Sequence, residues 1–286
     1  MCFSLIICTR NRAGPLKRCL DAVAAMDKPE RFELVIVDNG SSDDTALVIK
    51  AFEKNAGFNV VSAFESVSGL GNARNRGWRM ASGEICAFTD DDCYVERDFA
   101  HAILAAFRNK QRLGYLGGRI MLFDPTDLRI TINESKIPRF LPAGRFVPAG
   151  VIQGANFSFR RRALDDARGF DPLLGAGTRF PAEDVEICAR LSSLGWDGMY
   201  SPSPVVHHHH GRKSPEQAGT LHESYDVGRG AYYCANLLNP GLRLATTRFW
   251  FRTFRTNSRG RNVRELQGAF GYLGARLVAA MRNARR

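Results

Sequence analysis

Long apolar runs are missing from this 286-residue chain, although apolar residues make up 44% of it. No stretch approaches the roughly 18 uninterrupted apolar residues that predict a transmembrane helix. The N-terminus opens on the apolar segment 3–8, without the basic start or the small-residue cleavage site of a secretory signal. We therefore expect a cytoplasmic protein with a substantial hydrophobic core.

Paired cysteines are missing as well. The seven cysteines are an odd number, they are scattered along the chain, and no Cys-x-x-Cys pair occurs. Most of them lie inside apolar runs, where a free thiol behaves as a small hydrophobic side chain. This usage favours a reducing compartment.

Acidic residues are nearly absent from the C-terminus. Residues 240–286, here called the basic arm, contain eleven arginines, no lysine and one acid, Glu265, which gives a charge of +10 (11 − 1). The whole chain carries +11, so residues 1–239 carry about +1 (11 − 10). Such a concentration of positive charge favours a phosphate-bearing partner: a membrane surface, a lipid phosphate or nucleic acid.

Apolar segments of strand length alternate with helical segments over the first 90 residues. The pattern predicts strands at 3–8, 33–38, 58–63 and 84–88, joined by helices that end near residues 26, 54 and 81. This alternation indicates a mostly parallel sheet with helices on both faces. Ligands bind at the carboxyl ends of such strands, which here carry segments 9–12, 38–42 and 90–92.

The second half is less regular. Residues 115–135 suggest extended segments, the Pro- and Gly-rich residues 138–150 a loop, 183–195 a helix and 202–206 a short strand. We expect three parts: a nucleotide-binding half at 1–112, an acceptor-binding and catalytic half at 113–239, and a helical extension at 240–286.

Three consecutive aspartates, Asp90 to Asp92, follow the predicted strand 84–88. Adjacent carboxylates repel one another, and each tends to be neutral unless a cation is near. Mg²⁺ and Mn²⁺ take oxygen ligands and commonly hold substrate phosphates too. The triplet therefore suggests a divalent metal site, with an acidic loop or helix cap as the alternative.

Two further polar groups carry weaker signals. Glu183 and Asp184 stand at the start of the predicted helix 183–195. A carboxylate there can accept a proton from a hydroxyl nucleophile, but alone the pair favours a helix cap. Four histidines, 207–210, follow the predicted strand 202–206. Alternation would point half of them to each face, so that one can ligate a metal while the others pack or face solvent.

The glycine-rich segment 69–77 is only superficially similar to a dinucleotide-binding fingerprint. That motif follows the first strand, whereas here the first strand is followed by Thr-Arg-Asn-Arg. Arg74 and Arg76 lie near a helix start, where they suit a phosphate ligand better than a nicotinamide.

The order of these motifs resembles that of the family 2 glycosyltransferases, which have the GT-A fold. The matching segments span about residues 3–210 and lie at 7–12, 35–45, 73–75, 88–92, 154–160, 174–178, 183–186 and 202–208. The resemblance implies an α/β fold of GT-A type, a Rossmann-like mostly parallel sheet flanked by helices, to which the basic helical arm is added. It also implies an inverting transfer of sugar from a nucleotide-diphosphate sugar, with UDP-sugars favoured, to an acceptor hydroxyl in bacterial-type polysaccharide or glycolipid assembly.

The resemblance assigns a role to each matching residue. Asp184 corresponds to the catalytic base, and Glu183 acts on the acceptor side or supports that base. A divalent ion, Mn²⁺ or Mg²⁺, would be held by Asp90, Asp92 and His208. The nucleotide would be contacted by Thr9, Arg10, Asp38, Arg74 and Asp90.

Two other functions compete with this one. A sugar-phosphate nucleotidyltransferase shares a doubly wound sheet and metal-binding carboxylates, but segment 8–14 is a poor match for its Gly-rich loop. A non-enzymatic phosphate- or nucleic-acid-binding protein would explain the arm, but no nucleic-acid motif is visible and we expect no nucleic-acid partner.

The basic arm contains an apolar stripe at helical spacing, formed by Leu266, Phe270, Leu273, Leu277 and Met281. Gly268, Gly271 and Gly274 occupy a neighbouring face and weaken the helix in water. Segment 249–254 mixes aromatics with arginines, a composition suited to lipid headgroups. Either the stripe packs on the catalytic domain, or it attaches the protein peripherally to the inner face of the plasma membrane, near a glycan or lipid-linked acceptor.

Overall fold

A computed structural model describes residues 1–284. Its first half alternates strands and helices as predicted, with boundaries within a few residues. The elements are β1 (Phe3–Thr9), α1 (Ala13–Ala25), β2 (Phe32–Asp38), α2 (Thr45–Asn55), β3 (Asn59–Phe64), α3 (Leu70–Met80) and β4 (Ile85–Asp90).

The remaining elements complete one sheet and add a helical layer. They are β5 (Cys93–Val95), α4 (Phe99–Phe107), β6 (Leu113–Leu122), β7 (Arg139–Leu141), β8 (Asn156–Arg160), α5 (Arg161–Ala167), α6 (Glu183–Ser193), β9 (Asp197–His208), α7 (Pro215–Leu238), α8 (Arg243–Thr256) and α9 (Arg259–Ala284). The loop predicted at 138–150 was partly wrong, because its residues 139–141 pair with β9 as β7.

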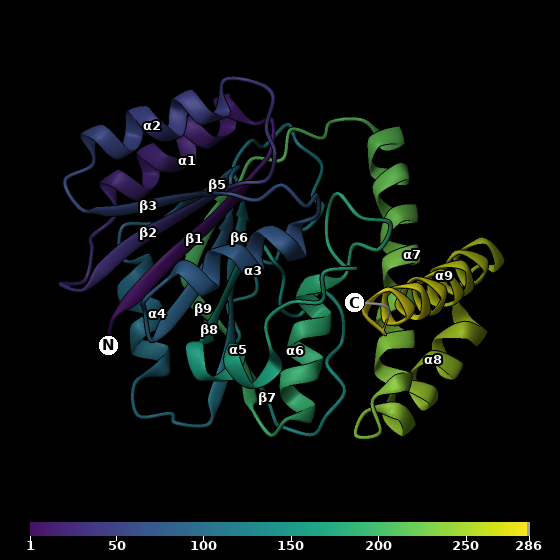
Figure 1. The fold of residues 1–286 in the computed structure, drawn as a ribbon. Coiled ribbons are helices and arrows are strands. Elements are labelled where there is room, and N and C mark those ends of the chain that lie inside the picture. Colours follow the sequence, from purple (N-terminus) through teal and green to yellow (C-terminus); the bar gives the residue numbers. More distant parts are fainter. Residues whose placement is uncertain (285–286) are drawn as a thin grey trace.

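The sheet is mixed, with strand order β3-β2-β1-β4-β8-β6-β9-β5 and β7 paired to β9. Strands β3, β2, β1 and β4 run parallel, and β8 runs antiparallel to β4 and β6. Strands of both halves of the chain thus lie in one sheet (Figure 1). The carboxyl ends of β1 and β4 meet at the same edge, which brings segments 9–12 and 90–92 together.

Both faces of the sheet are covered, which explains why β1 is apolar throughout. Ile6 packs in a core cluster with residues of α3, α5 and α6. Its neighbours Leu5 and Ile7 pack on the opposite face with residues of α1 and α4. A strand buried on both faces reads as a continuous apolar run rather than an alternating one.

Helices α7, α8 and α9 gather on one side of the molecule (Figure 1). Helix α7 begins with a capping box, in which Ser214 and Gln217 satisfy each other's backbone N–H groups. Helices α7 and α9 cross through glycines: a Cβ atom on Gly230 or Gly268 would overlap a backbone carbonyl of the other helix. The glycines of the arm therefore permit a close backbone contact that larger residues would prevent.

Glu265 is fully buried where the three helices meet. It accepts hydrogen bonds from Trp250 Nε1 at 2.9 Å, Arg229 Nε at 3.2 Å and Arg261 Nε at 3.1 Å. Arg264 pairs in turn with Asp226 at 3.0 Å. Two of the arm's arginines are therefore neutralised inside the protein, because their charges face buried carboxylates.

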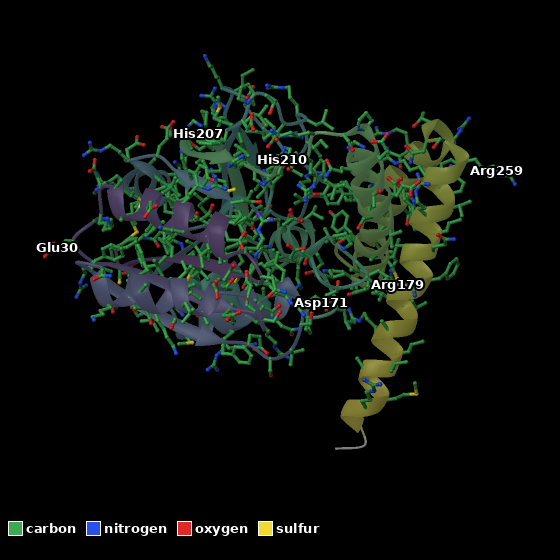
Figure 2. All side chains as sticks on the ribbon, turned by 90° about the horizontal axis from the view of Figure 1, so that it is seen from above. Glu30, Asp171, Arg179, His207, His210 and Arg259 are labelled. Atoms are coloured by element: carbon green, nitrogen blue, oxygen red, sulfur yellow. The ribbon has the colours of Figure 1, made fainter. Side chains whose placement is uncertain are left out.

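Most of the apolar stripe of the arm is exposed, and Leu273 is the member that is partly buried, against a core cluster that includes Phe180 and Tyr272. Phe270 is 70% exposed, Leu277 58% and Met281 56%, and the buried face of α9 is instead formed by Glu265, Gly268, Ala269 and Tyr272. Figure 2 shows the last turns of α9 extending beyond the other elements. The packing interpretation is thus wrong for most of the stripe and right for Leu273. None of the helices within residues 1–284 is long and apolar enough to cross a bilayer.

Candidate active site

A cavity of about 830 Å³ opens at the carboxyl ends of β1 and β4. One wall comes from the chain after these two strands, and the other from the start of α6 and from α7. Its size is within the usual range for small-molecule sites. Most of the residues selected from the sequence line it, namely Thr9, Arg10, Arg74, Asp90, Asp92, Glu183, Asp184 and His208.

The three aspartates have different partners. Asp91 accepts hydrogen bonds from Thr9 Oγ1 at 2.7 Å and from Arg12 Nε at 3.0 Å. Asp92 pairs through one oxygen with Arg12 and through the other with His208 Nε2, at 3.3 Å. Arg12, which the motif analysis did not single out, supplies part of the positive charge that the triplet needs.

Asp90, Asp92 and His208 bring one possible ligand atom each to within 4.8 Å of one another. Two carboxylate oxygens and one imidazole nitrogen form a donor set that suits Mn²⁺ or Mg²⁺. Cys93 lies in the same group, but burial raises the pKa of its thiol well above the usual value, so it offers no thiolate. These residues fit a divalent ion.

The four histidines alternate as predicted. His208 and His210 are buried, whereas His207 and His209 are partly exposed. Within residues 1–284, His208 is the histidine whose side chain contacts a carboxylate of the aspartate triplet: His207 pairs with Glu96 at 3.0 Å, and His210 Nε2 donates to the Leu128 carbonyl at 2.8 Å. Figure 2 labels His207 and His210 at the ends of the run.

Arg74 is almost completely buried and links the two acidic groups of the cleft. It donates to Glu183 at 2.6 Å, to Asp90 at 3.3 Å and to the Gly154 carbonyl at 3.2 Å. Burial raises the pKa of Glu183, and the Arg74 charge opposes that shift. The Arg74 guanidinium is thus already bonded to two carboxylates. Its predicted contact with the nucleotide would have to form in addition to these bonds.

Asp184 is the carboxylate of the cleft that has no cationic partner in the described part of the chain. Its oxygens accept from the backbone N–H groups of Gly154 at 3.0 Å and Val185 at 2.7 Å. Neither Glu183 nor Asp184 occupies the cap position, because the N-cap of α6 is Ala182. The N-cap position is therefore wrong for both acids, although they stand in the first turn of α6, where negative charge suits the helix dipole. The role of Asp184 as a base stays a prediction.

Helix α7 contributes residues that the sequence did not suggest. Leu221, His222 and Tyr225 line the cleft. Burial, and then the charge of Asp184, raise the pKa of Tyr225 to about 12, which keeps the phenol protonated. No motif marks these positions, and only the packing of α7 beside α6 brings them to the site.

On the nucleotide side, Arg10 donates to the Ser68 hydroxyl at the rim of the cleft. Asp38 is buried and accepts from the Ser41 N–H at 2.8 Å, but it does not line the cavity, whereas its neighbour Asn39 does. The role of Asp38 in base binding stays a prediction.

The sequence profile of glycosyl transferase family 2 matches residues 4–168, more than half of the chain. The chain belongs to this family. Among its relatives, the poly-beta-1,6-N-acetyl-D-glucosamine synthase of Staphylococcus epidermidis is 26% identical over 204 residues, covering 70% of this chain and 48% of that protein. The probable glycosyltransferase YdaM of Bacillus subtilis is 22% identical over 213 residues, covering 71% and 49%.

Solved structures confirm the GT-A fold for this family 2 chain. A mannosyltransferase from Pyrobaculum calidifontis, in complex with GDP-Man and Mn²⁺, superposes with a TM-score of 0.63 at 19% identity, covering 97% of this chain and 75% of that one. TarS 1–349 of S. aureus, in complex with UDP-GlcNAc, superposes at 0.64 with 20% identity, covering 90% and 74%. The chain spans about half the length of the curated relatives that it matches.

Proposed function

We propose that this family 2 protein transfers a sugar, with inversion, from a nucleoside-diphosphate sugar to an acceptor hydroxyl. One observation carries the proposal: a single cleft contains both a group able to hold a divalent ion and a carboxylate, Asp184, without a cationic partner. Arg74 connects the two sides of this cleft, because it bonds to Asp90 of the metal-binding group and to Glu183, the chain neighbour of Asp184. An unrelated acidic loop would have no need for either arrangement.

Asp184 acts as the general base. The backbone N–H groups of Gly154 and Val185 orient its carboxylate, which accepts the proton of the acceptor hydroxyl. The acceptor oxygen then attacks the anomeric carbon on the face opposite the nucleoside diphosphate, and the bond to that leaving group breaks. A divalent ion bound by Asp90, Asp92 and His208 would neutralise the diphosphate. The single displacement inverts the anomeric centre.

The relatives suggest the class of donor. One is named a poly-beta-1,6-N-acetyl-D-glucosamine synthase, and one structural neighbour was solved with UDP-GlcNAc. We therefore favour a UDP-sugar donor and an acceptor that belongs to a growing polysaccharide or a glycolipid. In this proposal residues 1–112 bind the nucleotide and residues 113–239 bind the acceptor.

The proposed transfer predicts release of nucleoside diphosphate. With Mn²⁺ and a panel of UDP- and GDP-sugars, the protein should release UDP or GDP from one donor, and EDTA should stop that release. Because a nucleotidyltransferase would instead form pyrophosphate from a sugar phosphate and a nucleoside triphosphate, both products are measured. Pyrophosphate formation without diphosphate release would contradict the proposal.

We further propose that the arm attaches the protein to an anionic membrane surface on the cytoplasmic side, beside a lipid-linked acceptor. Arg248, Arg252, Arg255, Arg259 and Arg282 form no ion pair within residues 1–284. Exposed Phe251 and Phe254 are interleaved with three of them on α8. Each basic residue near an anionic surface adds about 1 kcal/mol, and aromatic rings suit the headgroup region.

This attachment predicts co-sedimentation with vesicles that contain anionic lipid, and weaker binding as salt rises. The variant Phe270→Glu with Leu277→Glu should lose most of the binding, since both side chains are exposed on α9. Ile137→Glu with Phe140→Glu is the matched control, because it places the same two charges at exposed apolar residues outside the arm. Point variants are preferable to removal of the arm, which would uncover the buried partners of Glu265. Equal sedimentation of all three proteins would rule out an apolar contribution by the stripe.

A further inference from the structure

Hydrogen bonds and an ion pair hold the loop between β9 and α7, residues 209–214, at most of its residues. The His209 N–H donates to the Asp92 carbonyl at 2.9 Å, and the Gly211 N–H donates to Asp127 Oδ2 at 2.8 Å. Gly211 has a φ of +69°, a conformation that most L-residues avoid. The Lys213 ammonium binds Asp124 at 2.9 Å, and so the acidic cluster of Asp124, Asp127 and His209 already contains a cation.

Arg212 is held through its backbone on both sides. Its N–H donates to His210 Nδ1 at 3.0 Å, and its carbonyl accepts from the Leu128 N–H at 2.8 Å. His210 in turn donates through Nε2 to the Leu128 carbonyl. The fourth histidine therefore fixes the position of Arg212, since one ring joins the two segments.

The Arg212 side chain is left free by these bonds and lines the cleft. Most other guanidiniums there are paired: Arg12 with Asp91 and Asp92, Arg74 with Glu183 and Asp90, Arg129 with Glu134, and Arg229 with Asp226 and Glu265. Within residues 1–284 only Arg10 and Arg212 line the cleft without a carboxylate partner.

Arg212 stands in the chain between His208 of the metal-binding group and α7, and it lines the cleft that both of these line. It follows His208 by four residues and precedes the first turn of α7. Its charge contributes a lowering effect to the pKa of Tyr225, after the larger effect of burial and that of Asp184. The Arg212 charge thus acts on Tyr225, and both residues line the cleft that contains the metal-binding group.

We propose that Arg212 binds the diphosphate of the donor and stabilises it as the leaving group. This inference rests on the proposed function and names a residue for it. When the bond between the anomeric carbon and the diphosphate oxygen breaks, both electrons go to that oxygen, and Arg212 donates hydrogen bonds to the developing charge without transferring a proton. The hydrogen bonds of the Arg212 backbone limit the positions that its guanidinium can take, and the guanidinium itself has no carboxylate partner within residues 1–284. Such an arrangement suits a hydrogen-bond donor that is positioned before the ligand binds.

The test measures the binding of UDP, GDP and the matching monophosphates to the full chain in Mn²⁺. For the nucleoside that wild type binds, Arg212→Gln should weaken diphosphate binding by about tenfold or more, which corresponds to about 1.4 kcal/mol. Monophosphate binding should change much less, and Arg212→Lys should restore part of the loss. Donor turnover by Arg212→Gln should fall by about 10²-fold in kcat.

Arg129→Gln is the matched control, because it removes the same charge from a guanidinium of the same cleft that is already paired with Glu134. It should leave diphosphate binding within about twofold of wild type, a small change on a scale where tenfold is 1.4 kcal/mol. Equal losses in the Arg129 and Arg212 variants, or equal losses of mono- and diphosphate, would overturn the assignment of Arg212. A wild-type protein that binds no nucleoside diphosphate in Mn²⁺ would overturn the proposed function and this inference together.

Discussion

Asp184→Asn should reduce sugar transfer by about 10²- to 10⁴-fold, the usual contribution of a general base. The amide keeps the shape of the carboxylate but cannot accept the proton of the acceptor hydroxyl. Donor binding should be retained, because Asp184 bonds only to the backbone of Gly154 and Val185 and pairs with no cation in the described chain. Transfer rates and nucleotide affinity are measured on the same preparation.

A matched control for this variant is Asp165→Asn, which removes one negative charge from an exposed position on α5. It should transfer sugar at the wild-type rate. If Asp184→Asn also transferred at nearly that rate, the carboxylate would only position the chain around Gly154, and another group would have to accept the proton.

Asp92→Ala should abolish metal-dependent turnover, since it removes one of three ligands. The fold should largely survive, because Arg12 loses only one of its two carboxylate partners, keeps Asp91, and is 36% exposed and can be hydrated. Asp91→Asn is the control one residue away: it removes a carboxylate that bonds Thr9 and Arg12 but lies outside the ligand group. Mn²⁺ affinity and diphosphate release are the two measurements.

Asp91→Asn should bind Mn²⁺ nearly as well as wild type. Burial raises the pKa of Asp91 to about 6, so this carboxyl group binds a proton more readily than that of an ordinary aspartate. Full activity of Asp92→Ala in the presence of EDTA would eliminate the metal from the proposed mechanism.

The first half of the fold could be predicted from the sequence because its signals are local. An apolar run such as β1, buried on both faces, needs no knowledge of its neighbours to be seen as a strand. The carboxyl ends of parallel strands share an edge, so the meeting of Thr9 with Asp91 follows from topology. The order of the motifs then indicated the family, and the resemblance to that family supplied the expected roles of the residues.

The partners of the site residues could not be predicted in the same way. Arg74 and Glu183 are 109 positions apart, and their contact depends on how α3 and α6 pack against the sheet. A positive charge near a helix start suggests a phosphate ligand, but the buried carboxylate of Glu183 and the half-buried carboxylate of Asp90 compete for the same guanidinium. Arg12 was overlooked for a similar reason, because its role depends on Asp91 and Asp92 from another strand.

The arm illustrates a third limit. The spacing of its apolar residues correctly predicts a helix. Spacing alone does not say which face of that helix packs against the rest of the protein. Helix α9 buries the face that carries glycine, alanine and Glu265, because two backbones can approach closely only where side chains are small. The larger apolar side chains remain on the opposite, exposed side.

The glycine crossing of α7 and α9 has a mechanical consequence. Side chains between two helices can change rotamer and absorb a displacement, but at Gly230 and Gly268 the backbones meet with no such layer between them. A change in the tilt of α9 would therefore displace α7 directly, because no side chains lie between the two backbones to absorb it. Because Tyr225 lies on α7 and lines the same cleft as Asp184, a change in the angle between α9 and α7 would move the wall of that cleft.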